Sequence, residues 1–593
     1  MRRPFFAFVP ALLIAALIPL AADGAVQVLA NFELDPPPSW QTAEQRLERG
    51  SWVKHSSPVV ADLGDGPVIL VGSQNGKLYA LKYRNGSLTK VWDSGTAIDT
   101  FIDSSPAVGD LNGDGCPEVV VGAGNENRPQ GSGVHVFDCH GRNHRFWAAS
   151  VGDIPNHVGV FSSPAIGDVT GDGSPEVVYG SFDQRIYVKD RNGRDLPGWP
   201  HQNFDTIWSS PALADINGDG KKEIIIGTDL GGGDAVFGCP KATRGTLKIF
   251  DGSGNFMPNF PKCLDTPIWS SPSVQDINGD GTLDVVIGTN NYKENGVVVG
   301  DPRIVRAFDT KSGREIWHTA LGNRTRVFSS AAIGDVGGDG SLDIAFGTLQ
   351  DPNYGEVFLL DAHTGRIRWH REGGHRDVCA CAFMGSPVIA DVDGDSKPEV
   401  VATSQVGSIS AWDEAGNVVI DSLYLSENLG TPPGKGSFMF FNSPAVGDTD
   451  GNGTNEIVAA SGLSGSNPRR GFVWIVATRG RGQGPWPFFK RTPDRISSVG
   501  AGPAGAPAAD PQPSRAPART RRPSAAGPVT SKATPTPTPR PSKSPSPVPL
   551  SYVVPHREDP NNGLRIVLGL LASAATVSAA GVVLEAYRKR VIG

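Results

Sequence analysis

A nine-residue pattern, Asp-x-Asn-Gly-Asp-Gly-x-x-Glu/Asp or a near copy of it, recurs eight times between Asp62 and Glu456. Six of the eight copies stand behind a Ser-Pro-Ala/Val stretch, and the copies stand ahead of an apolar run such as residues 119–122. A repeat of this period is typical of a stacked or circular array of β units, each able to hold a hard cation. The first aspartates of the copies are Asp62, Asp110, Asp168, Asp215, Asp276, Asp335, Asp391 and Asp448.

Each repeat also has the alternation of apolar runs and turn residues that is typical of a small antiparallel sheet. In residues 104–147, apolar runs alternate with turn residues so that four short strands are expected, the last of them at Trp147. Four strands per unit are typical of a propeller blade, and neighbouring blades must cover the faces of its sheet. We therefore predict an all-β fold, a β-propeller of eight four-stranded blades over residues 26–498. In the alternative of seven blades, the irregular first repeat and residues 26–55 form a closing element.

Tryptophans recur near the end of the expected fourth strands. Their regular spacing favours packing between blades over stacking against a ligand. These residues are Trp92, Trp147, Trp317 and Trp369.

The N-terminal residues have the composition of an export signal. Arg2 and Arg3 precede an apolar run, residues 5–20, which ends in small residues up to Ala25. We predict a signal peptide over residues 1–25. The alternative is a transmembrane anchor, which two prolines and the short apolar core disfavour.

The C-terminal part of the chain carries a second apolar stretch. Residues 566–584 contain no charge, and Arg588, Lys589 and Arg590 follow. This pattern predicts a transmembrane helix over residues 564–587 and a short cytoplasmic tail over residues 588–593. Residues 499–560, rich in Pro, Ala, Ser and Thr, are expected to be a disordered stalk. The expected location is the cell membrane, single-pass, with the propeller extracellular or periplasmic.

The spacing within each repeated loop fits a cation site. Oxygens at positions 1, 3 and 5, a backbone carbonyl at position 7 and a carboxylate at position 9 can form an oxygen shell, and glycines at positions 4 and 6 allow the tight turn. Hard oxygens without Cys or His side-chain ligands favour Ca²⁺ over zinc or copper, and Mg²⁺ needs stricter geometry. We predict several Ca²⁺ ions per chain. The alternative is that Asn-Gly and Asp-Gly only make turns.

The copies differ in their expected strength as metal sites. The strongest are Asp110, Asn112, Asp114, Cys116 and Glu118; Asp215, Asn217, Asp219, Lys221 and Glu223; Asp276, Asn278, Asp280, Thr282 and Asp284; and Asp391, Asp393, Asp395, Lys397 and Glu399. Credible sites are Asp168, Thr170, Asp172, Ser174 and Glu176, and Asp448, Asp450, Asn452, Thr454 and Glu456. A weaker one is Asp335, Asp339, Ser341 and Asp343, with Gly337 at position 3. The first copy, residues 62–67, is one residue short, lacks the final acid and is expected to be empty.

Composition and motif searches exclude several functions. The formal net charge is -7, and residues 511–550 are basic, so the repeat region is more acidic than the average and does not suit nucleic acid as a ligand. No zinc-protease, hydrolase or phosphate-loop motif occurs, so no catalytic residue is assigned. The histidines, such as His318, His370 and His375, are scattered.

Six cysteines in an exported chain indicate disulfides. Local pairing is expected, with the third pair the most strained because its ring is short. For that third pair, free thiols or a redox role are the alternatives. The expected pairs are Cys116 with Cys139, Cys239 with Cys263, and Cys379 with Cys381.

The loops between second and third strands lie on the face opposite the metal loops. Long loops on a rigid scaffold often carry recognition, so a protein or glycan ligand is expected there. The long ones span residues 123–133, 228–245, 289–303 and 462–471.

The repeated loop, with Phe346-Gly347-Thr348 after one copy, resembles the FG-GAP repeat of integrin α subunits and bacterial surface proteins. This resemblance implies structural Ca²⁺ in the loops and a role in adhesion or ligand binding. Asp361, Gly365 and Trp369 resemble the tryptophan-docking repeat of quinoprotein propellers. The leading hypothesis is a membrane-anchored extracellular calcium-binding propeller. The alternatives are an exported quinoprotein-like or polysaccharide-active enzyme and a scaffold of a membrane complex.

Overall fold

The computed structural model describes most of the repeat region and leaves both ends of the chain outside it. The described residues are 26–39, 41–42, 50–125, 128–148, 159–203, 205–229, 237–240, 243–290, 292–294, 297–299, 303–321, 325–350, 354–372, 382–429, 438–439, 441–463 and 469–492. The expected signal peptide, stalk, transmembrane helix and tail lie outside these ranges, as do Cys379 and Cys381. Within them, no helix combines the length and the apolar character needed to cross a membrane.

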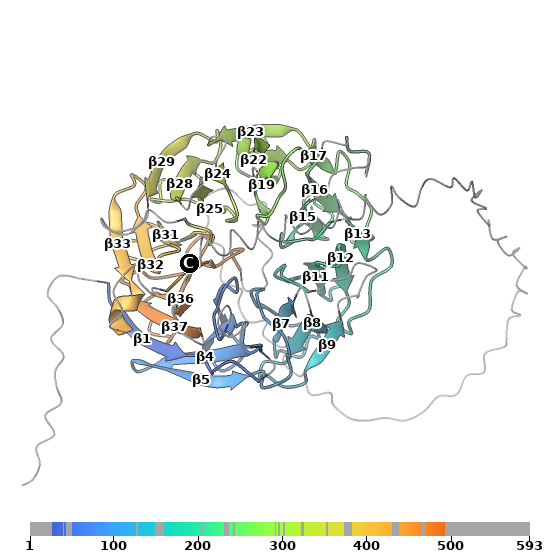
Figure 1. Cartoon of the computed structure of the whole chain (residues 1–593). Coiled ribbons are helices and arrows are strands. Elements are labelled where there is room, and N and C mark those ends of the chain that lie inside the picture. Colours follow the sequence, from blue (N-terminus) through green and yellow to red (C-terminus); the bar gives the residue numbers. More distant parts are fainter. Residues whose placement is uncertain are drawn as a thin grey trace, which may run out of the picture. The chain divides into compact units, whose positions relative to one another are not determined.

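The described residues form eight antiparallel blades around one axis (Figure 1); seven are four-stranded, and in the eighth the short strand β34 (Phe438–Met439) pairs as a fifth. The expected all-β propeller of eight blades is confirmed. Blades 1 to 4 are β2 (Val59–Asp62), β3 (Pro67–Gly72), β4 (Leu78–Arg84) and β5 (Ser87–Asp93); β6 (Ala107–Gly109), β7 (Glu118–Asn125), β8 (Arg128–Phe137) and β9 (Arg145–Ala148); β10 (Ala165–Gly167), β11 (Glu176–Gly180), β12 (Arg185–Lys189) and β13 (His201–Gln202); and β14 (Ala212–Ala214), β15 (Glu223–Asp229), β16 (Gly245–Phe250) and β17 (Lys262–Leu264).

The remaining blades follow the same meander, and blade 8 takes its outer strand from the start of the chain. β1 pairs antiparallel with β37. Residues 26–55 therefore supply the closing strand, while the number of blades stays eight. Blades 5 to 8 are β18 (Ser273–Gln275), β19 (Asp284–Gly288), β22 (Arg303–Asp309) and β23 (Glu315–Ala320); β25 (Ala332–Gly334), β26 (Asp343–Gly347), β28 (Glu356–Asp361) and β29 (Ile367–Glu372); β30 (Val388–Ala390), β31 (Glu399–Thr403), β32 (Ser408–Trp412) and β33 (Val418–Tyr424); and β35 (Ala445–Gly447), β36 (Glu456–Leu463), β37 (Arg470–Ala477) and β1 (Val28–Glu33).

The small elements beyond the four meander strands of each blade decorate the connections. Part of each expected long loop is in fact strand, because β7 and β8 extend as a hairpin to the pair Asn125 and Arg128, and a second hairpin lies between β19 and β22. These elements are β20 (Tyr292–Glu294), β21 (Val297–Val299), β24 (Thr325–Arg326), β27 (Leu349–Gln350), β34 (Phe438–Met439) and the 3-10 helix η1 (Leu425–Leu429).

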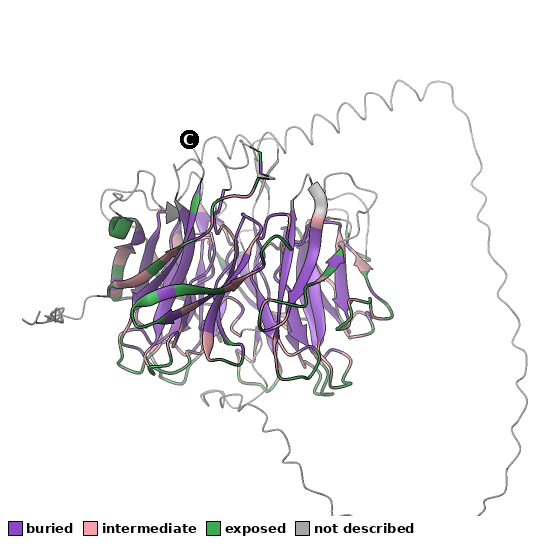
Figure 2. Cartoon of the chain, turned by 90° about the horizontal axis from the view of Figure 1, so that it is seen from below, coloured by how far each residue is buried: buried purple, intermediate pink, exposed green. Residues whose placement is uncertain are grey.

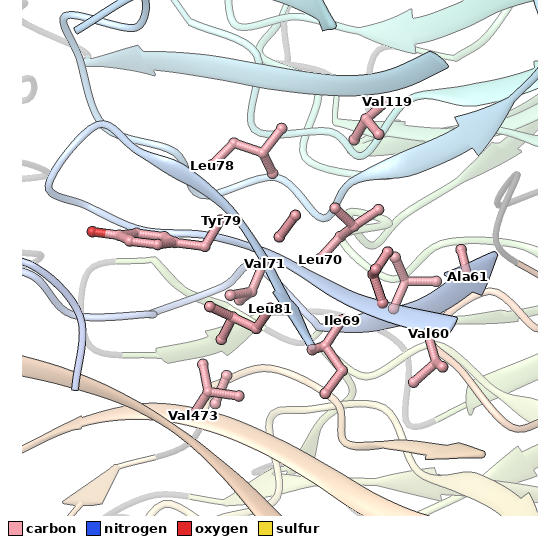
Figure 3. Packing of buried hydrophobic residues seen from close by; sticks show 14 of the residues in the cluster. Val60, Ala61, Ile69, Leu70, Val71, Leu78, Tyr79, Leu81, Val119 and Val473 are labelled. Atoms are coloured by element: carbon pink, nitrogen blue, oxygen red, sulfur yellow. The ribbon is translucent and has the colours of Figure 1, made fainter. Parts of the chain in front are cut away.

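The inner strands of the blades are buried on both faces of their sheet. In blade 1, Leu70 and Leu78 point toward Val119 of blade 2, whereas Ile69 and Leu81 point toward Val473 of blade 8 (Figure 3). Burial is continuous through the blades, and exposed residues lie mainly in the turns and on the outer strands (Figure 2). Each sheet is therefore stabilised by its two neighbours, as the repeat pattern predicted.

The antiparallel meander gives the propeller two different faces. The Asp110–Glu118 loop and its equivalents join first to second strands, and we call the end of the propeller that carries them the aspartate face. The opposite end carries Ser104-Ser105-Pro106 and its equivalents, and we call it the serine face. The connections between second and third strands lie on the serine face.

A closed circle of hydrogen bonds joins the blades on the serine face. In every blade, the second serine of the Ser-Ser pair or its equivalent donates its backbone N–H to the hydroxyl of the matching serine in the next blade, at 2.7–3.0 Å. The last bond runs from Ser443 N to Ser57 Oγ and joins blade 8 to blade 1. We call this circle the serine ring; its members are Ser57, Ser105, Ser163, Ser210, Ser271, Ser330, Ser386 and Ser443.

In blades 1 to 6, a glycine follows the apolar run of the second strand and allows the next blade to approach closely. A β-carbon at Gly227 would lie 2.3 Å from Ile268 of blade 5, and one at Gly122 would lie 2.5 Å from Val160 of blade 3. The N–H of Gly122 donates to Ser104 Oγ, at 2.7 Å. The Val-Val-Gly ending thus reflects close approach between blades.

The fourth-strand tryptophans pack between blades, as expected. Trp317 covers Gly365 of blade 6, where a β-carbon would lie 2.5 Å from the indole, and its Nε1 donates to Ala362 O at 2.9 Å. Trp369 makes the same bond to Glu414 O of blade 7, also at 2.9 Å. Trp92 and Trp147 cover glycines of the following blades in the same way.

Residues 484–491 run inside the ring of blades (Figure 1, orange trace). Pro485 packs against Gly334 of blade 6, and Trp486 bridges Ile389 of blade 7. Pro487 O accepts the N–H of Val446 in blade 8, at 2.9 Å. The buried Lys490 Nζ donates to the carbonyls of Ser210 and Pro211 in blade 4. We call residues 484–491 the axial segment.

Two of the three expected disulfides are confirmed. Cys116 pairs with Cys139, and Cys239 pairs with Cys263. The first joins an aspartate loop to the next turn on the same face, and the second ties the long β15–β16 connection to β17.

Candidate metal-binding loops

Seven of the eight aspartate loops have one geometry, which the strand register imposes. In blade 2 the residue before Asp110 pairs with Glu118, so the loop is closed by the first rung of the β6–β7 ladder. The same rung occurs in blades 3 to 8. The ninth-position acids that stand on it are Glu118, Glu176, Glu223, Asp284, Asp343, Glu399 and Glu456.

Side-chain oxygens at positions 1, 3 and 5 fold the loop by accepting backbone N–H groups. Asp110 Oδ1 accepts from Gly113 at 2.7 Å, and its Oδ2 accepts from Gly115 at 2.9 Å. Asn112 Oδ1 accepts from Asp114 at 2.9 Å. Both glycines have positive φ, 75° and 82°, which explains their place in the motif. These hydrogen bonds hold the turn in a fixed shape.

The pattern is shared across the loops. Asp215, Asp276 and Asp448 each accept from the glycines at positions 4 and 6, as Asp168 does. Position 7 donates its N–H to the side chain at position 5 in all seven loops. These donors are Cys116, Ser174, Lys221, Thr282, Ser341, Lys397 and Thr454, and the acceptors are Asp114, Asp172, Asp219, Asp280, Asp339, Asp395 and Asn452.

The ninth-position carboxyl is buried beneath the loop. Glu118 accepts the N–H of Leu111, at 2.8 Å, and the equivalent bond recurs in the six other loops. All seven acids have 3% or less of their surface exposed. Burial without a matching positive charge is unfavourable for a carboxylate.

In the loops of blades 3 to 8, burial raises the pKa of the ninth-position acid. Burial first, and the neighbouring loop aspartates second, raise the pKa of Glu223 to about 7. The same causes raise the pKa of Asp284 and of Glu399 to about 8. In Glu176, burial raises the pKa to about 7, and the pKa of Glu456 is raised as well. Without a nearby cation, these acids therefore keep their protons to a higher pH than exposed carboxyls do.

The donor set fits a calcium ion. Asp284 Oδ1 is buried and has no hydrogen-bond partner among the described residues. In blades 7 and 8, three carboxyls each place an oxygen within 4.8 Å of the others, namely Asp391, Asp393 and Glu399, and Asp448, Asp450 and Glu456. Oxygen atoms of several carboxyls around one point are the ligands that Ca²⁺ prefers. Cys116, Cys139 and His140 also lie close together, but both sulfurs are in the disulfide.

An arginine partly compensates the charge in two loops, which the sequence pattern did not reveal. In blade 6, Arg368 Nε lies 2.9 Å from Asp343 Oδ1. Burial raises the pKa of Asp343 to about 7, against the opposing effect of Arg368. This loop has Gly337 at position 3, so the chain supplies a cation where a ligand is missing. In blade 2, Arg145 lies 3.5 Å from Glu118.

The first loop has a different construction. Ala61 pairs with Val68, so the loop is two residues shorter than the others, not one as expected. Val68, an apolar residue, occupies the rung of the ninth-position acid. Asp62 Oδ1 accepts from Gly64 at 2.7 Å and from Gly66 at 2.9 Å, so its carboxylate is engaged in closing the turn.

Comparison with known families supports the assignment of the repeats. A model of the FG-GAP repeat matches residues 104–137, and one of an FG-GAP-like repeat matches residues 168–226. A model described as outer membrane protein assembly factor BamB matches residues 266–465. The chain thus carries FG-GAP-type repeats within an eight-bladed β-propeller. A search of curated proteins finds no match.

Solved structures resemble the chain at the level of the fold. The exotype rhamnogalacturonan lyase YesX is 15% identical, with 76% of each chain covered and a TM-score of 0.47. Saccharomyces cerevisiae Sqt1 is 12% identical over 77% of this chain and 99% of its own, with a TM-score of 0.43. A Bacillus licheniformis rhamnogalacturonan lyase is 16% identical over 73% and 75%, with a TM-score of 0.42.

Proposed function

We propose that the protein is an exported, membrane-anchored propeller whose aspartate loops bind Ca²⁺ and whose serine face binds an external protein or glycan ligand. The function is recognition, and the role of the cations is structural. The expected export signal and C-terminal anchor place the propeller outside the cell, where calcium is abundant enough to occupy such loops.

The observation that carries the calcium part is the buried ninth-position acid. It recurs in seven loops at the same rung, under two or three further oxygen ligands. A turn alone does not need this residue, because the first loop folds with Val68 in its place. An acid that the fold does not require, held where its charge is unfavourable, is best explained by a cation.

Each loop residue then has a defined task. Positions 1, 3 and 5 keep the turn folded through backbone N–H groups and direct their remaining oxygen lone pairs inward. The ninth-position acid joins the loop to the second strand of the blade. When bound, Ca²⁺ supplies the positive charge that lets these carboxylates remain ionised together.

Metal analysis of the purified chain tests the proposal. We expect six or seven Ca²⁺ ions per chain, because the blade 1 loop lacks the ninth acid and the blade 6 loop has an internal arginine. Asp219→Asn in blade 4 should remove one ion, and Asp65→Asn in blade 1 should remove none. A chain that holds no calcium at millimolar concentration would refute this part.

The ligand part requires a separate experiment. The intact chain is applied to an array of surface proteins and oligosaccharides, with and without a chelator. Binding that survives truncation of the β15–β16 and β19–β22 connections would contradict recognition by the serine face. An array without any ligand would leave calcium binding as the only supported part.

A scaffold in a membrane complex is the second candidate. The match of residues 266–465 to the model of a membrane protein assembly factor favours it. Co-purification of the full chain from its native membrane would yield stable protein partners in this case. The enzyme alternatives predict quinone absorbance or polysaccharide cleavage by the purified chain.

A further inference from the structure

One residue in each blade stands directly before the Ser-Ser pair or its equivalent, at the serine face and close to the axis. First strands of neighbouring blades contact each other around the axis, so these residues form a circle just outside the serine ring. In blade order the residues are His55, Asp103, Phe161, Trp208, Trp269, Phe328, Met384 and Phe441.

The repeats provide an internal control for what the fold needs at this position. Blades 1, 2 and 7 carry His55, Asp103 and Met384 there, yet the serine ring passes through them without a break. An aromatic side chain is therefore not required to build a blade. Four consecutive blades, 3 to 6, nevertheless carry one. We call Phe161, Trp208, Trp269 and Phe328 the aromatic arc.

The arc is partly exposed, and its rings contact each other in two pairs. Trp208 keeps 38% of its surface exposed, which is unusual for the largest apolar side chain. Its ring centroid lies 5.6 Å from that of Phe161. The rings of Trp269 and Phe328 stack, with centroids 5.0 Å apart. Phe182 also packs against Trp208, with ring centroids 4.6 Å apart.

Acidic groups border the arc. Trp269 donates its Nε1–H to Asp229 Oδ2, at 2.5 Å, so the indole orientation is fixed. Asn203 Nδ2 donates to the backbone carbonyls of both Asp205, at 2.9 Å, and Asp229, at 3.1 Å, so these two acidic residues are neighbours. A carboxylate such as that of Asp205 accepts hydrogen bonds from hydroxyl groups and repels anions.

We propose that the aromatic arc binds a neutral glycan chain. This inference rests on the proposed function, since it specifies the ligand of the serine face. Sugar rings present C–H groups on their faces, which pack on indole and phenyl rings, and hydroxyl groups at their edges, which donate to carboxylates. The serine ring holds the four aromatic residues at fixed positions before the ligand arrives, which reduces the entropy lost on binding. Uronic acid chains are disfavoured by Asp205.

The test measures binding of hexasaccharides to the purified full-length chain by calorimetry and by quenching of tryptophan fluorescence. The probes are neutral hexamers of glucose, mannose, xylose and N-acetylglucosamine, and a galacturonate hexamer. We expect at least one neutral hexamer to bind. Trp208→Ala should weaken its binding on the order of thirtyfold, as for a central aromatic contact.

Two further variants separate a binding role from a folding role. Phe146→Ala removes an aromatic of similar exposure, 43%, from the outer strand β9 and should leave binding unchanged. Trp269→Phe keeps a ring on Phe328 but loses the bond to Asp229, and should weaken binding less than Trp208→Ala. Melting temperature and calcium content should stay unchanged in all three.

Three outcomes would overturn the inference. Binding of the galacturonate hexamer in preference to every neutral one, for instance through the nearby Arg326, would exclude a neutral glycan. Neutral binding that Trp208→Ala leaves intact would exclude the arc. A chain that binds a protein ligand but no hexamer would refute the glycan while leaving the proposed function standing. A chain without any ligand would refute both the glycan and the ligand part of the proposed function, and would leave only its calcium part.

Discussion

The aspartate face and the serine face are both built from an eightfold repeat, yet they satisfy their polar groups in opposite ways. On the serine face, every ring N–H finds a hydroxyl of the next blade, and the circle is complete within the chain. On the aspartate face, seven buried acids lie beneath loops that carry further carboxylates, and in the described part of the chain two of these acids have an arginine within 3.5 Å. The first face satisfies its ring N–H groups within the chain, whereas we propose that the second takes positive charge from bound Ca²⁺.

The two faces also tolerate change differently. The serine ring keeps all eight members, because one missing hydroxyl would leave a buried N–H without a partner. The aspartate loops range from complete ligand sets to the shortened loop of blade 1, since each loop is closed by its own ladder. Dependence on calcium and pH should therefore be confined to the aspartate face.

The largest expected effect is removal of calcium at neutral pH. A cation at 100 times its Kd stabilises the folded state by about 2.7 kcal/mol per site. Six or more sites therefore make chelation a large change in the free energy of unfolding, which thermal and urea melts would detect. Melts that coincide with and without chelator would remove the distinction between the faces.

The pH dependence of the metal-free protein is the next effect. The pKa values of Glu223 and Asp284 are raised to about 7 and about 8, against about 4 for unfolded carboxyls. The folded state therefore binds more protons than the unfolded state between about pH 4 and 8, and stability should fall as pH rises through this window. With calcium present the fall should be much smaller. Urea melts at pH 5 and 8 measure it, and Asp284→Asn should reduce the slope.

Breaking the serine ring should lower the free energy of unfolding by a smaller amount, which should not depend on calcium. Ser271→Ala removes the acceptor of the Ser210 N–H, a bond of 3.0 Å, and should cost about 1–3 kcal/mol. Ser87 is exposed on β5, and Ser87→Ala is the matched control, with an expected change within about 0.5 kcal/mol. The cost of Ser271→Ala should be equal in calcium and in chelator; an unequal cost would show that the two faces are coupled.

The smallest effect is expected in the first loop. Asp65→Asn should alter neither the melting temperature nor its shift on chelation, because Val68 stands where the other loops have an acid. Asp219→Asn, at position 5 of a complete loop, should reduce that shift. Equal effects of the two variants would mean that the first loop binds a cation after all.

Much of this architecture was predictable from periodicity. The phase of the repeat identified eight blades, and the spacing from Asp110 to Glu118 predicted the tight turn between first and second strands. These features depend on neighbours in the sequence. The predicted length of the loop that begins at Asp62 was wrong by one residue, because the pairing of Ala61 with Val68 fixes this length and the motif does not.

The features that the sequence did not reveal join distant parts of the chain. Ser443 bonds Ser57 across 386 residues, and Lys490 reaches Ser210 across 280. The Ser-Pro stretch is evident in the sequence, but its serine hydroxyls accept N–H groups of neighbouring blades only when the blades are arranged in a circle. Arg368 likewise compensates the charge of Asp343 from another strand of the blade, β29, which lies outside the loop motif.

The axial segment determines how the propeller responds to mechanical load. Tension on the chain beyond residue 492 acts first on residues 484–491, whose contacts lie on blades 4, 6, 7 and 8, and only afterwards on β37. A tether attached there pulls near the axis of the disc and not at its rim. The force is then divided among several blades, so that no single strand ladder carries it alone.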